Sequence, residues 1–356
     1  MPDAIPQRLL LVRRRYLGDL VLLDPLLRSL RAAFPKLYLA LLTDAGYAEV
    51  LAQHPALDRI VGLPSSLPGQ IGTAFALRRL GFDTCLNLSP GPRTAWLTFG
   101  IPRRIGFQTE GTRRPNGVNE PLVRPASFFR NHPILDLYAE LLPALGVKAE
   151  PTPCRFFFPE AAREEAAERL RRAFPCSCRP FVLIHPGARL PARRWPEAGF
   201  AEAVARLQAE NRADLLLVSG PGEEALLADI AALLKAKGIS IPALSGLSLD
   251  LFAALCGRAA VYLGNDTGSM HVAAATLSET LPEKGKIVAL FGSQSATVWA
   301  PSVAGTGRSC TVLQPSLPCG AACVAPGRCD PANDYATRCI ARIGVDEVVA
   351  AVLAAL

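Results

Sequence analysis

The feature that most constrains the fold is an alternation of short apolar runs with longer helical patterns. Apolar runs at 8–13, 37–43 and 82–89 are separated by helix-like segments, of which 18–34 is the clearest. Strands that alternate with helices in this way indicate parallel βαβ units. The predicted fold class is therefore α/β with parallel sheets.

The alternation is interrupted near 148–180 by a proline-punctuated stretch and a charged helix, and it then restarts. A chain of 356 residues exceeds what one core usually holds, and half of its residues are hydrophobic. We therefore predict a first lobe at 1–165 and a second lobe at 166–343. The amphipathic segment 344–356 is expected to pack back on the first lobe, and the polar stretch 108–127 is expected to be a long loop.

The net charge of +7 favours anionic partners, such as nucleotides, phosphorylated glycolipids, membrane surfaces or nucleic acid. The basic residues are scattered and aromatic residues make up only 7%, which argues against a nucleic-acid platform. No signal peptide is recognisable, and no apolar run approaches the roughly 20 residues of a membrane span. The expected location is the cytoplasm.

Ligands of open α/β sheets bind outside the carboxyl ends of the strands. Five predicted strand ends carry polar or glycine-rich turns, namely Arg13–Asp19, His185–Arg194, Ser219–Glu224, Gly264–His271 and Phe291–Ser295. Four of these turns belong to the second half. The second lobe is therefore predicted to hold a nucleotide, and the first lobe to hold an acceptor.

The turn Gly264–His271 joins a predicted strand to a helix. Asp266 follows the strand and Thr267-Gly268 open the helix, whose free N–H groups suit a pyrophosphate. An ordinary helix cap explains Asp266 or Thr267 equally well, and His271 among small apolar residues fits a packed histidine. An aspartic protease also uses Asp-Thr-Gly, but it requires two such loops or a dimer in a β-rich fold.

Two further turns of the second lobe combine glycine with charge. Gly187, after His185, allows close approach of the backbone to a ligand, and Arg193 and Arg194 offer forked hydrogen bonding to phosphate. A solvated basic loop is the alternative. In the turn at Gly220, the neighbouring glutamates Glu223 and Glu224 suit ribose hydroxyls, or else simply favour the start of the next helix.

Gly18-Asp19 ends the short loop after the first strand. This loop lacks the glycine spacing of a dinucleotide fingerprint, and no phosphate-loop Lys follows. Asp19 is placed either as a general base or as a helix cap.

Taken in order, these motifs resemble glycosyltransferase family nine, the ADP-heptose:lipopolysaccharide heptosyltransferases. The resemblance rests on "RLLLVRRRYLGDLVLLDPLLRSLRAAFP", "IHPGA", "RRWP", "SGPGEE", "LSGLSLDLFAALCGRAAVYLGNDTGSMHVAAA" and "VALFGSQSATVWAP", which together span nearly the whole chain. It implies the GT-B fold, in which two Rossmann-like lobes flank a cleft and the second lobe holds the sugar nucleotide.

The resemblance also implies roles for individual residues. Asp19 would be the general base, and Arg193 would offset the charge on the departing ADP. Asp266 would bind hydroxyls of the donor sugar, Thr267 and Gly268 would meet the diphosphate, and His271 would support the site. The implied donor-binding set is His185, Gly187, Arg194, Gly220, Glu223, Glu224, Asp266, Thr267, Gly268 and His271.

The implied reaction is an inverting transfer of heptose from ADP-heptose to a lipopolysaccharide core acceptor. No Asp-X-Asp pair occurs, and helix N–H groups with Arg can stabilise the leaving group, so we expect no metal requirement. The implied partners are an ADP-sugar and an anionic glycolipid, with peripheral contact to the inner membrane. The alternatives are another acceptor or donor, a GT-B sugar-nucleotide epimerase, or a non-catalytic nucleotide-binding protein.

Two sets of residues have less specific signals. Arg93, Arg113 and Arg114 of the first lobe fit either an acidic acceptor or a solvated face. The loop 310–339 contains a cysteine cluster, Cys319, Cys323, Cys329 and Cys339, that suits a structural zinc or iron ion. Reduced thiols or one disulfide explain the cysteine cluster equally well.

Overall fold

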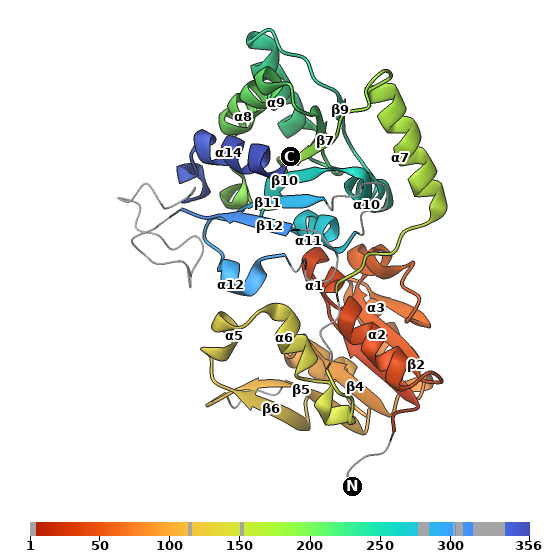
Figure 1. Ribbon diagram of the computed structural model, residues 1–356. Helices are drawn as coiled ribbons and strands as arrows, with labels where there is room; N and C mark the ends of the chain where they lie inside the picture. The colour runs from red at the N-terminus through yellow and green to blue at the C-terminus, as the bar shows by residue number, and fades with distance from the viewer. Residues whose placement is uncertain are drawn as a thin grey trace. The chain divides into compact units, whose positions relative to one another are not determined.

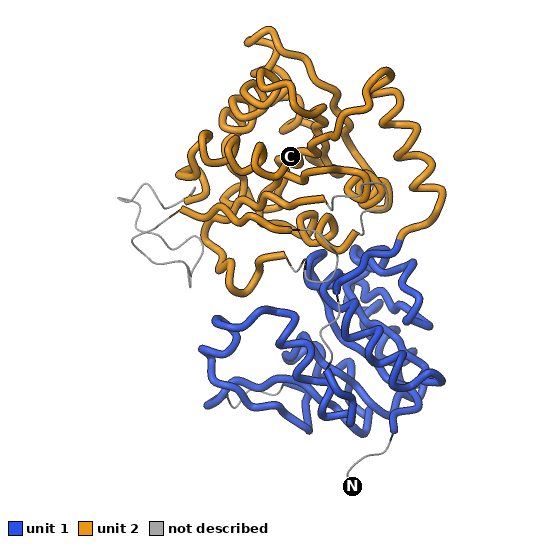
Figure 2. Tube along the Cα trace, viewed as in Figure 1, with its two compact units in different colours: residues 1–157 blue, residues 158–356 orange. Residues whose placement is uncertain are grey.

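The computed structural model describes residues 5–112, 116–149, 153–276, 285–301, 303, 309–315 and 339–356. The chain forms two compact units, Met1–Phe157 and Phe158–Leu356 (Figure 2). Each unit is built on a parallel sheet with helices, which confirms the predicted α/β class (Figure 1). The boundary differs from the predicted 165/166 because helix α7, Glu160–Ala173, packs against helix α10 of the second unit.

The first unit contains a six-stranded sheet in the order β3-β2-β1-β4-β5-β6. Its strands are β1 Arg8–Val12, β2 Tyr38–Asp44, β3 Arg59–Leu63, β4 Thr84–Asn87, β5 Arg103–Thr109 and β6 Glu120–Arg124. Its helices are α1 Leu17–Val21, α2 Asp24–Ala33, η1 Ala45–Leu51, α3 Leu67–Arg79, α4 Pro92–Leu97, α5 Phe128–Asn131, α6 Ile134–Ala139 and η2 Pro143–Leu145. The central strands are almost wholly buried, as their uninterrupted apolar sequences require.

The predicted loop at 108–127 is partly wrong. It contains the end of β5 and the whole of β6, which pair in parallel from Ile105 with Glu120 to Thr109 with Arg124. β6 is an edge strand, and most of its side chains are exposed or only half-buried. An exposed edge needs no apolar pattern, so the polar sequence carried no strand signal.

The second unit repeats the plan with a sheet in the order β12-β11-β10-β7-β8-β9. Its strands are β7 Phe181–His185, β8 Asp214–Val218, β9 Ala243–Leu244, β10 Val261–Asn265, β11 Lys286–Leu290 and β12 Ser309–Leu313. With α7, its helices are η3 Pro191–Arg193, α8 Glu197–Glu210, α9 Glu224–Ala236, α10 Leu249–Arg258, α11 Gly268–Ala275, α12 Ala296–Trp299, η4 Cys339–Arg342 and α14 Val345–Ala355.

The C-terminal helix packs on the second unit. α14 lies against α8 and β11, with Val348 and Val352 fully buried in the core of that unit. The indole of Trp195 donates to the carbonyl of Ile343 at 3.0 Å just before the helix. The apolar face of α14 completes this core, and the amphipathic pattern alone could not specify which surface it would cover.

The strand order of each sheet reverses once. The chain runs outward through β1, β2 and β3 and then returns to place β4 on the other side of β1. In the second unit it runs through β7, β8 and β9 and returns to place β10 beside β7. Crevices form outside the carboxyl ends of the strands at such reversals. Each unit therefore has one favoured ligand position, after β1 and β4 or after β7 and β10.

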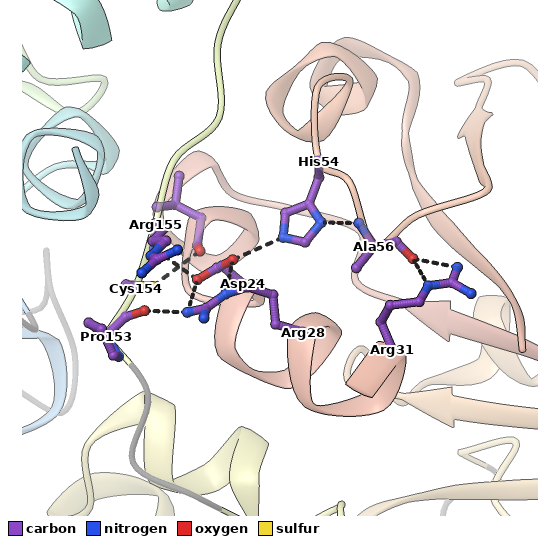
Figure 3. A network of polar contacts seen from close by, with 9 residues as sticks. Asp24, Arg28, Arg31, His54, Ala56, Pro153, Cys154 and Arg155 are labelled. Atoms are coloured by element: carbon purple, nitrogen blue, oxygen red, sulfur yellow. Dashed lines mark hydrogen bonds and ion pairs between the residues drawn. The ribbon is translucent and has the colours of Figure 1, made fainter. Parts of the chain in front are cut away.

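A buried ionic network fixes the last segment of the first unit (Figure 3). The fully buried carboxylate of Asp24, on α2, accepts hydrogen bonds from Arg28 Nε at 2.9 Å and Nη2 at 2.8 Å. It also accepts from the backbone N–H of Arg155 at 2.8 Å and lies 3.0 Å from His54 Nε2. Because His54 Nδ1 accepts from the N–H of Ala56, the ring proton belongs on Nε2. Burial would raise the pKa of Asp24, but hydrogen bonds from His54 and Arg28 bring it below its usual value.

Candidate active site

Asp19 lies in the first unit at the reversal between β1 and β4. It is the third residue of α1, and its Oδ2 accepts the backbone N–H of Tyr16 at 2.8 Å. Its Oδ1 pairs with the guanidinium of Arg13, and the side chain is 9% exposed. The capping contact of a helix start is therefore present. Each carboxylate oxygen has two lone pairs, so a position for a further proton or hydroxyl group remains.

Arg13 and Tyr138 hold Asp19 in place. Arg13 also donates to the carbonyl of Leu88, just after β4, at 2.8 Å, and its guanidinium lies 5.7 Å from the ring of Tyr138. The hydroxyl of Tyr138 donates to the backbone carbonyl of Asp19 at 3.4 Å. Burial raises the pKa of Tyr138, so its proton stays in place. Burial alone would lower the pKa of Arg13, but Tyr138 and Asp19 raise it, so Arg13 remains charged.

In the second unit, Asn265 links the two strands at the reversal. Its side chain is fully buried at the end of β10, where Oδ1 accepts from the N–H of Trp195 at 3.0 Å. Its Nδ2 donates to the carbonyl of Pro186, just after β7, at 2.7 Å. Sequence reasoning missed this residue. The available signal was an amide side chain at the end of an apolar strand, which must find hydrogen-bond partners when buried.

Asp266, directly after β10, lies beside Arg193, which ends η3 in the loop after β7. The backbone N–H of Asp266 donates to Leu290 at 2.8 Å, and its carboxylate lies 3.6 Å from Arg193 Nη1. Burial raises the pKa of Asp266 to about 6, although the charge of Arg193 opposes this shift. The carboxylate of Asp266 can therefore accept hydrogen bonds from the hydroxyl groups of a ligand.

The helix that follows Asp266 has an open N-terminus. Thr267 occupies the N-cap position of α11 in an extended conformation, but its hydroxyl makes no capping hydrogen bond. The first N–H groups of α11, from Gly268, thus have no side-chain cap and favour an anion. His271 is buried in this helix, and burial lowers its pKa to about 4, so it is neutral at pH 7. A packed, uncharged supporting role fits His271 better than acid–base chemistry.

Of the two adjacent glutamates, only Glu223 turns inward. Its Oε2 lies 3.2 Å from His185 Nε2 and accepts the N–H of Gly220 at 3.2 Å. A Cβ atom at Gly187 would overlap both of its carboxylate oxygens. Burial would raise the pKa of Glu223, but the hydrogen bond with His185 lowers it. Glu224 is exposed, and its Oε1 accepts the backbone N–H of Gly222 at 3.1 Å.

Tyr262 is a second residue that sequence reasoning missed, because a tyrosine within an apolar strand has the pattern of a core residue. Its ring lies over Gly264, where a Cβ would overlap the hydroxyl, so the side chain extends toward the carboxyl end of β10. Burial raises the pKa of Tyr262 well above its usual value, and the negative charge of Glu223 adds to this shift. The hydroxyls of Tyr262 and Thr267 are both buried without a hydrogen-bond partner among the residues that the structure describes.

Unpaired buried atoms gather at this edge of the second sheet. Among the described residues, His185 Nδ1, Ser219 Oγ and His271 Nδ1 are buried without a hydrogen-bond partner, and Asp266 Oδ2 has only its ion pair with Arg193. They end or follow β7, β8 and β10. Buried polar groups are normally paired, so such a concentration indicates a site that an external molecule completes.

The remaining predicted residues have different outcomes. Arg194 donates to the carbonyl of Ala188 at 2.7 Å and so shapes the loop after β7. Arg93 is exposed in the first turn of α4. The predicted residues Arg113, Arg114, Cys319, Cys323 and Cys329 lie outside the described part of the chain.

Cys339 is buried in η4. Within the described residues, no three His, Cys, Asp or Glu side chains are placed to hold a metal ion. The zinc or iron prediction therefore gains no support from them.

Comparisons with known proteins agree with this architecture. The model of the family described as glycosyltransferase family 9 (heptosyltransferase) matches residues 73–323. The chain is 26% identical over 312 residues to lipopolysaccharide heptosyltransferase 2 of Escherichia coli K12, which covers 83% of this chain and 85% of that protein.

Two solved structures share the fold. A family 9 glycosyl transferase from Veillonella parvula superposes with a TM-score of 0.77 at 20% identity, covering 98% of this chain and 97% of the other. The E. coli heptosyltransferase WaaC, solved with ADP, superposes with a TM-score of 0.70 at 17% identity, covering 98% of this chain and 100% of the other.

Proposed function

Because the chain belongs to glycosyltransferase family 9 and is a GT-B glycosyltransferase, we propose that it transfers heptose from ADP-heptose to a lipopolysaccharide core acceptor. The main support from its own residues is the uncapped N-terminus of α11 beside Asp266 and Arg193. This arrangement brings together N–H groups, a guanidinium and a carboxylate that can accept hydrogen bonds from hydroxyl groups. A sugar joined to a nucleoside diphosphate requires the same set of groups.

The donor binds in the second unit. The diphosphate accepts the N–H groups at Thr267 and Gly268, and Arg193 neutralises the charge that builds on ADP as the sugar departs. Asp266 accepts hydrogen bonds from hydroxyls of the sugar. Glu223, held by His185 and Gly220, keeps lone pairs for the ribose.

The acceptor binds in the first unit, where Asp19 is the general base. Asp19 takes the proton of the acceptor hydroxyl as that oxygen bonds to the anomeric carbon and the bond to ADP breaks, which inverts the configuration. Arg13 and Tyr138 fix the orientation of Asp19. Since Arg193 and the N–H groups of α11 supply positive potential at the leaving group, the transfer needs no metal ion.

The acceptor is anionic, in keeping with the net charge of +7 and the exposed Arg93. No described helix is long and apolar enough to span a bilayer. We propose that the protein works in the cytoplasm and reaches the lipid-anchored acceptor through peripheral contact with the inner membrane.

A panel of ADP- and UDP-sugars, incubated with protein and purified lipopolysaccharide core acceptors, tests the proposal. Mass spectrometry identifies the released nucleotide and the modified acceptor. We expect ADP release with ADP-heptose and a core acceptor that gains one heptose. Transfer from UDP-sugars alone, or nucleotide release without modification of any core acceptor, would contradict the proposed donor and acceptor.

A further inference from the structure

Figure 1 shows helix α3 on the first unit. This helix buries two polar side chains and exposes three large apolar ones, while Ala74 and Leu77 also face the core. Gln70 and Thr73 are buried and bond locally, to the carbonyls of Ser65 and Gly69, each at 2.9 Å. Leu67, Ile71 and Phe75 are 67%, 40% and 57% exposed. Their spacing of four residues aligns them along one face. A row of exposed large apolar side chains is unusual on a surface helix.

The neighbouring helix α4 and the residue pair after it also expose large apolar side chains. α3 and α4 contact each other and cover the same side of the first sheet, with Leu77 and Leu97 in one core cluster. Trp96, on α4, is 41% exposed, and Phe99, just after it, is 68% exposed. Single exposed apolar residues are common, but a group of them on adjoining helices marks an interaction site. We call Leu67, Ile71, Phe75, Trp96 and Phe99, with Arg78 and Arg79, the α3–α4 surface.

The charged residues of the segment that contains α3 and α4 are basic, with one exception. Between Asp58 and Glu110 the only acidic residue is Asp83, and its carboxylate accepts hydrogen bonds from the backbone N–H groups of Gln7 and Arg8. Arg78 and Arg79 are exposed in the last turn of α3. Neither forms an ion pair with an acidic residue in the described part of the chain.

The guanidinium of Arg78 lies 5.7 Å from the ring centroid of Phe75. The positive charge therefore adjoins the apolar face.

We propose that the α3–α4 surface docks on an anionic lipid bilayer. Exposed aromatic and aliphatic side chains enter the boundary between headgroups and acyl chains, while the arginines pair with lipid phosphates. The absence of carboxylates from the described surface of α3 and α4 favours a lipid partner, because a uniformly negative surface repels acidic side chains.

Docking here goes beyond transfer itself and assigns the membrane contact to particular side chains. The docking proposal rests on the proposed function only because transfer to a lipid-anchored acceptor gives a reason for membrane attachment. Binding to vesicles is measured without donor or acceptor, so failure of the docking proposal and failure of the proposed reaction give separate results.

The test is sedimentation of the full chain with vesicles of phosphatidylcholine alone or of phosphatidylcholine with phosphatidylglycerol. Ile71→Ser and Phe75→Ser reduce the apolar face, and the double variant Arg78→Gln/Arg79→Gln reduces its charge. Leu233→Ser is matched to Ile71→Ser, because both side chains are 40% exposed on helices. Arg171→Gln/Arg172→Gln is the matched charge control, an adjacent exposed pair in the last turn of α7.

We expect the wild type to bind anionic vesicles in preference to neutral ones. The Arg78→Gln/Arg79→Gln variant should lose about tenfold or more in partitioning, since each basic residue at a membrane surface is worth about a factor of five. Ile71→Ser and Phe75→Ser should each lose about fivefold, because burying a half-exposed apolar side chain is worth about 1 kcal/mol. The matched controls should bind like the wild type. Thermal unfolding and transfer to a soluble acceptor fragment should be unchanged in the α3 variants.

Three results would overturn the proposal. The first is wild-type protein that does not bind anionic vesicles, and the second is α3 variants that bind as well as their controls. The third is a concentration-dependent oligomer that the α3 variants abolish while vesicle binding persists, since the surface would then be a protein interface.

Discussion

Asp24→Ala should destabilise the first unit strongly, because the carboxylate of Asp24 is the centre of a buried network. The substitution removes the acceptor of four contacts, two from Arg28 and one each from His54 and the N–H of Arg155. The side chain of His54 is 1% exposed, so its Nε2 proton would be left without water or protein. The N–H of Arg155 would also lose its partner.

The expected loss of unfolding free energy follows from the buried groups that lose their partner. Removing one partner of a buried ion pair costs about 3–5 kcal/mol, and each orphaned buried donor contributes about 1–3 kcal/mol. The Arg28 side chain is 23% exposed and keeps its bond to the carbonyl of Pro153, which lowers the cost. We therefore expect a loss of about 3 kcal/mol.

Glu165→Ala is the matched control. Glu165 and Arg169 form an ion pair with the same spacing and direction along a helix as Asp24 and Arg28, but their side chains are 48% and 46% exposed. An exposed pair of this kind is worth about 0.3–0.5 kcal/mol.

Hydrogen exchange of peptides from β2 and β8 during urea unfolding reports the two units separately. Protection of β2 should fall in Asp24→Ala while protection of β8 is retained. A loss of less than about 1 kcal/mol, or one equal to that of Glu165→Ala, would refute the reasoning.

Three further substitutions test the second unit. Gly187→Ala should displace Glu223 from its contacts and weaken ADP binding about tenfold by calorimetry; unchanged affinity would show that Glu223 is not needed there. Asn265→Ala should destabilise the unit by about 2–3 kcal/mol in thermal unfolding, because it leaves the N–H of Trp195 unpaired; a neutral result would remove Asn265 as the link between the strand ends. The raised pKa of Asp266 means that its ionised carboxylate destabilises the folded, ligand-free unit. This destabilisation is complete above about pH 6 and disappears as the pH falls toward 3.8, the pKa in the unfolded chain. The ligand-free unit should therefore gain up to roughly 3 kcal/mol over this window, whereas Asp266→Asn should show no such gain.

The sequence predicted the strands that are buried on both faces, because their apolar runs are continuous and each is followed by a turn. The run at 8–13 became β1, and its polar end led directly to Asp19. Elements with weaker physical signals escaped prediction. β6 is an exposed edge strand, and the amphipathic sequence of α14 does not encode that it completes the core of the second unit.

The candidate site was predictable where backbone motifs define it and not where distant side chains meet. The turn Gly264–His271 identified the open helix start after β10. The contacts of Asn265 with Trp195 and of Tyr138 with Asp19 join residues that are 70 and 119 positions apart. Only the strand order brings such pairs together, so no local pattern could reveal them. The choice between Glu223 and Glu224 likewise depended on which side chain reaches His185.

The most direct test of the central claim is transfer by Asp19→Asn, measured with ADP-heptose and a lipopolysaccharide core acceptor, beside Asp58→Asn as the control. Asp58 lies in the same unit but pairs with Arg31 with 39% of its side chain exposed. We predict that Asp19→Asn lowers kcat about 10²–10⁴-fold while ADP affinity stays unchanged, and that Asp58→Asn retains activity. Transfer by Asp19→Asn at the wild-type rate would contradict the assignment of Asp19 as the base.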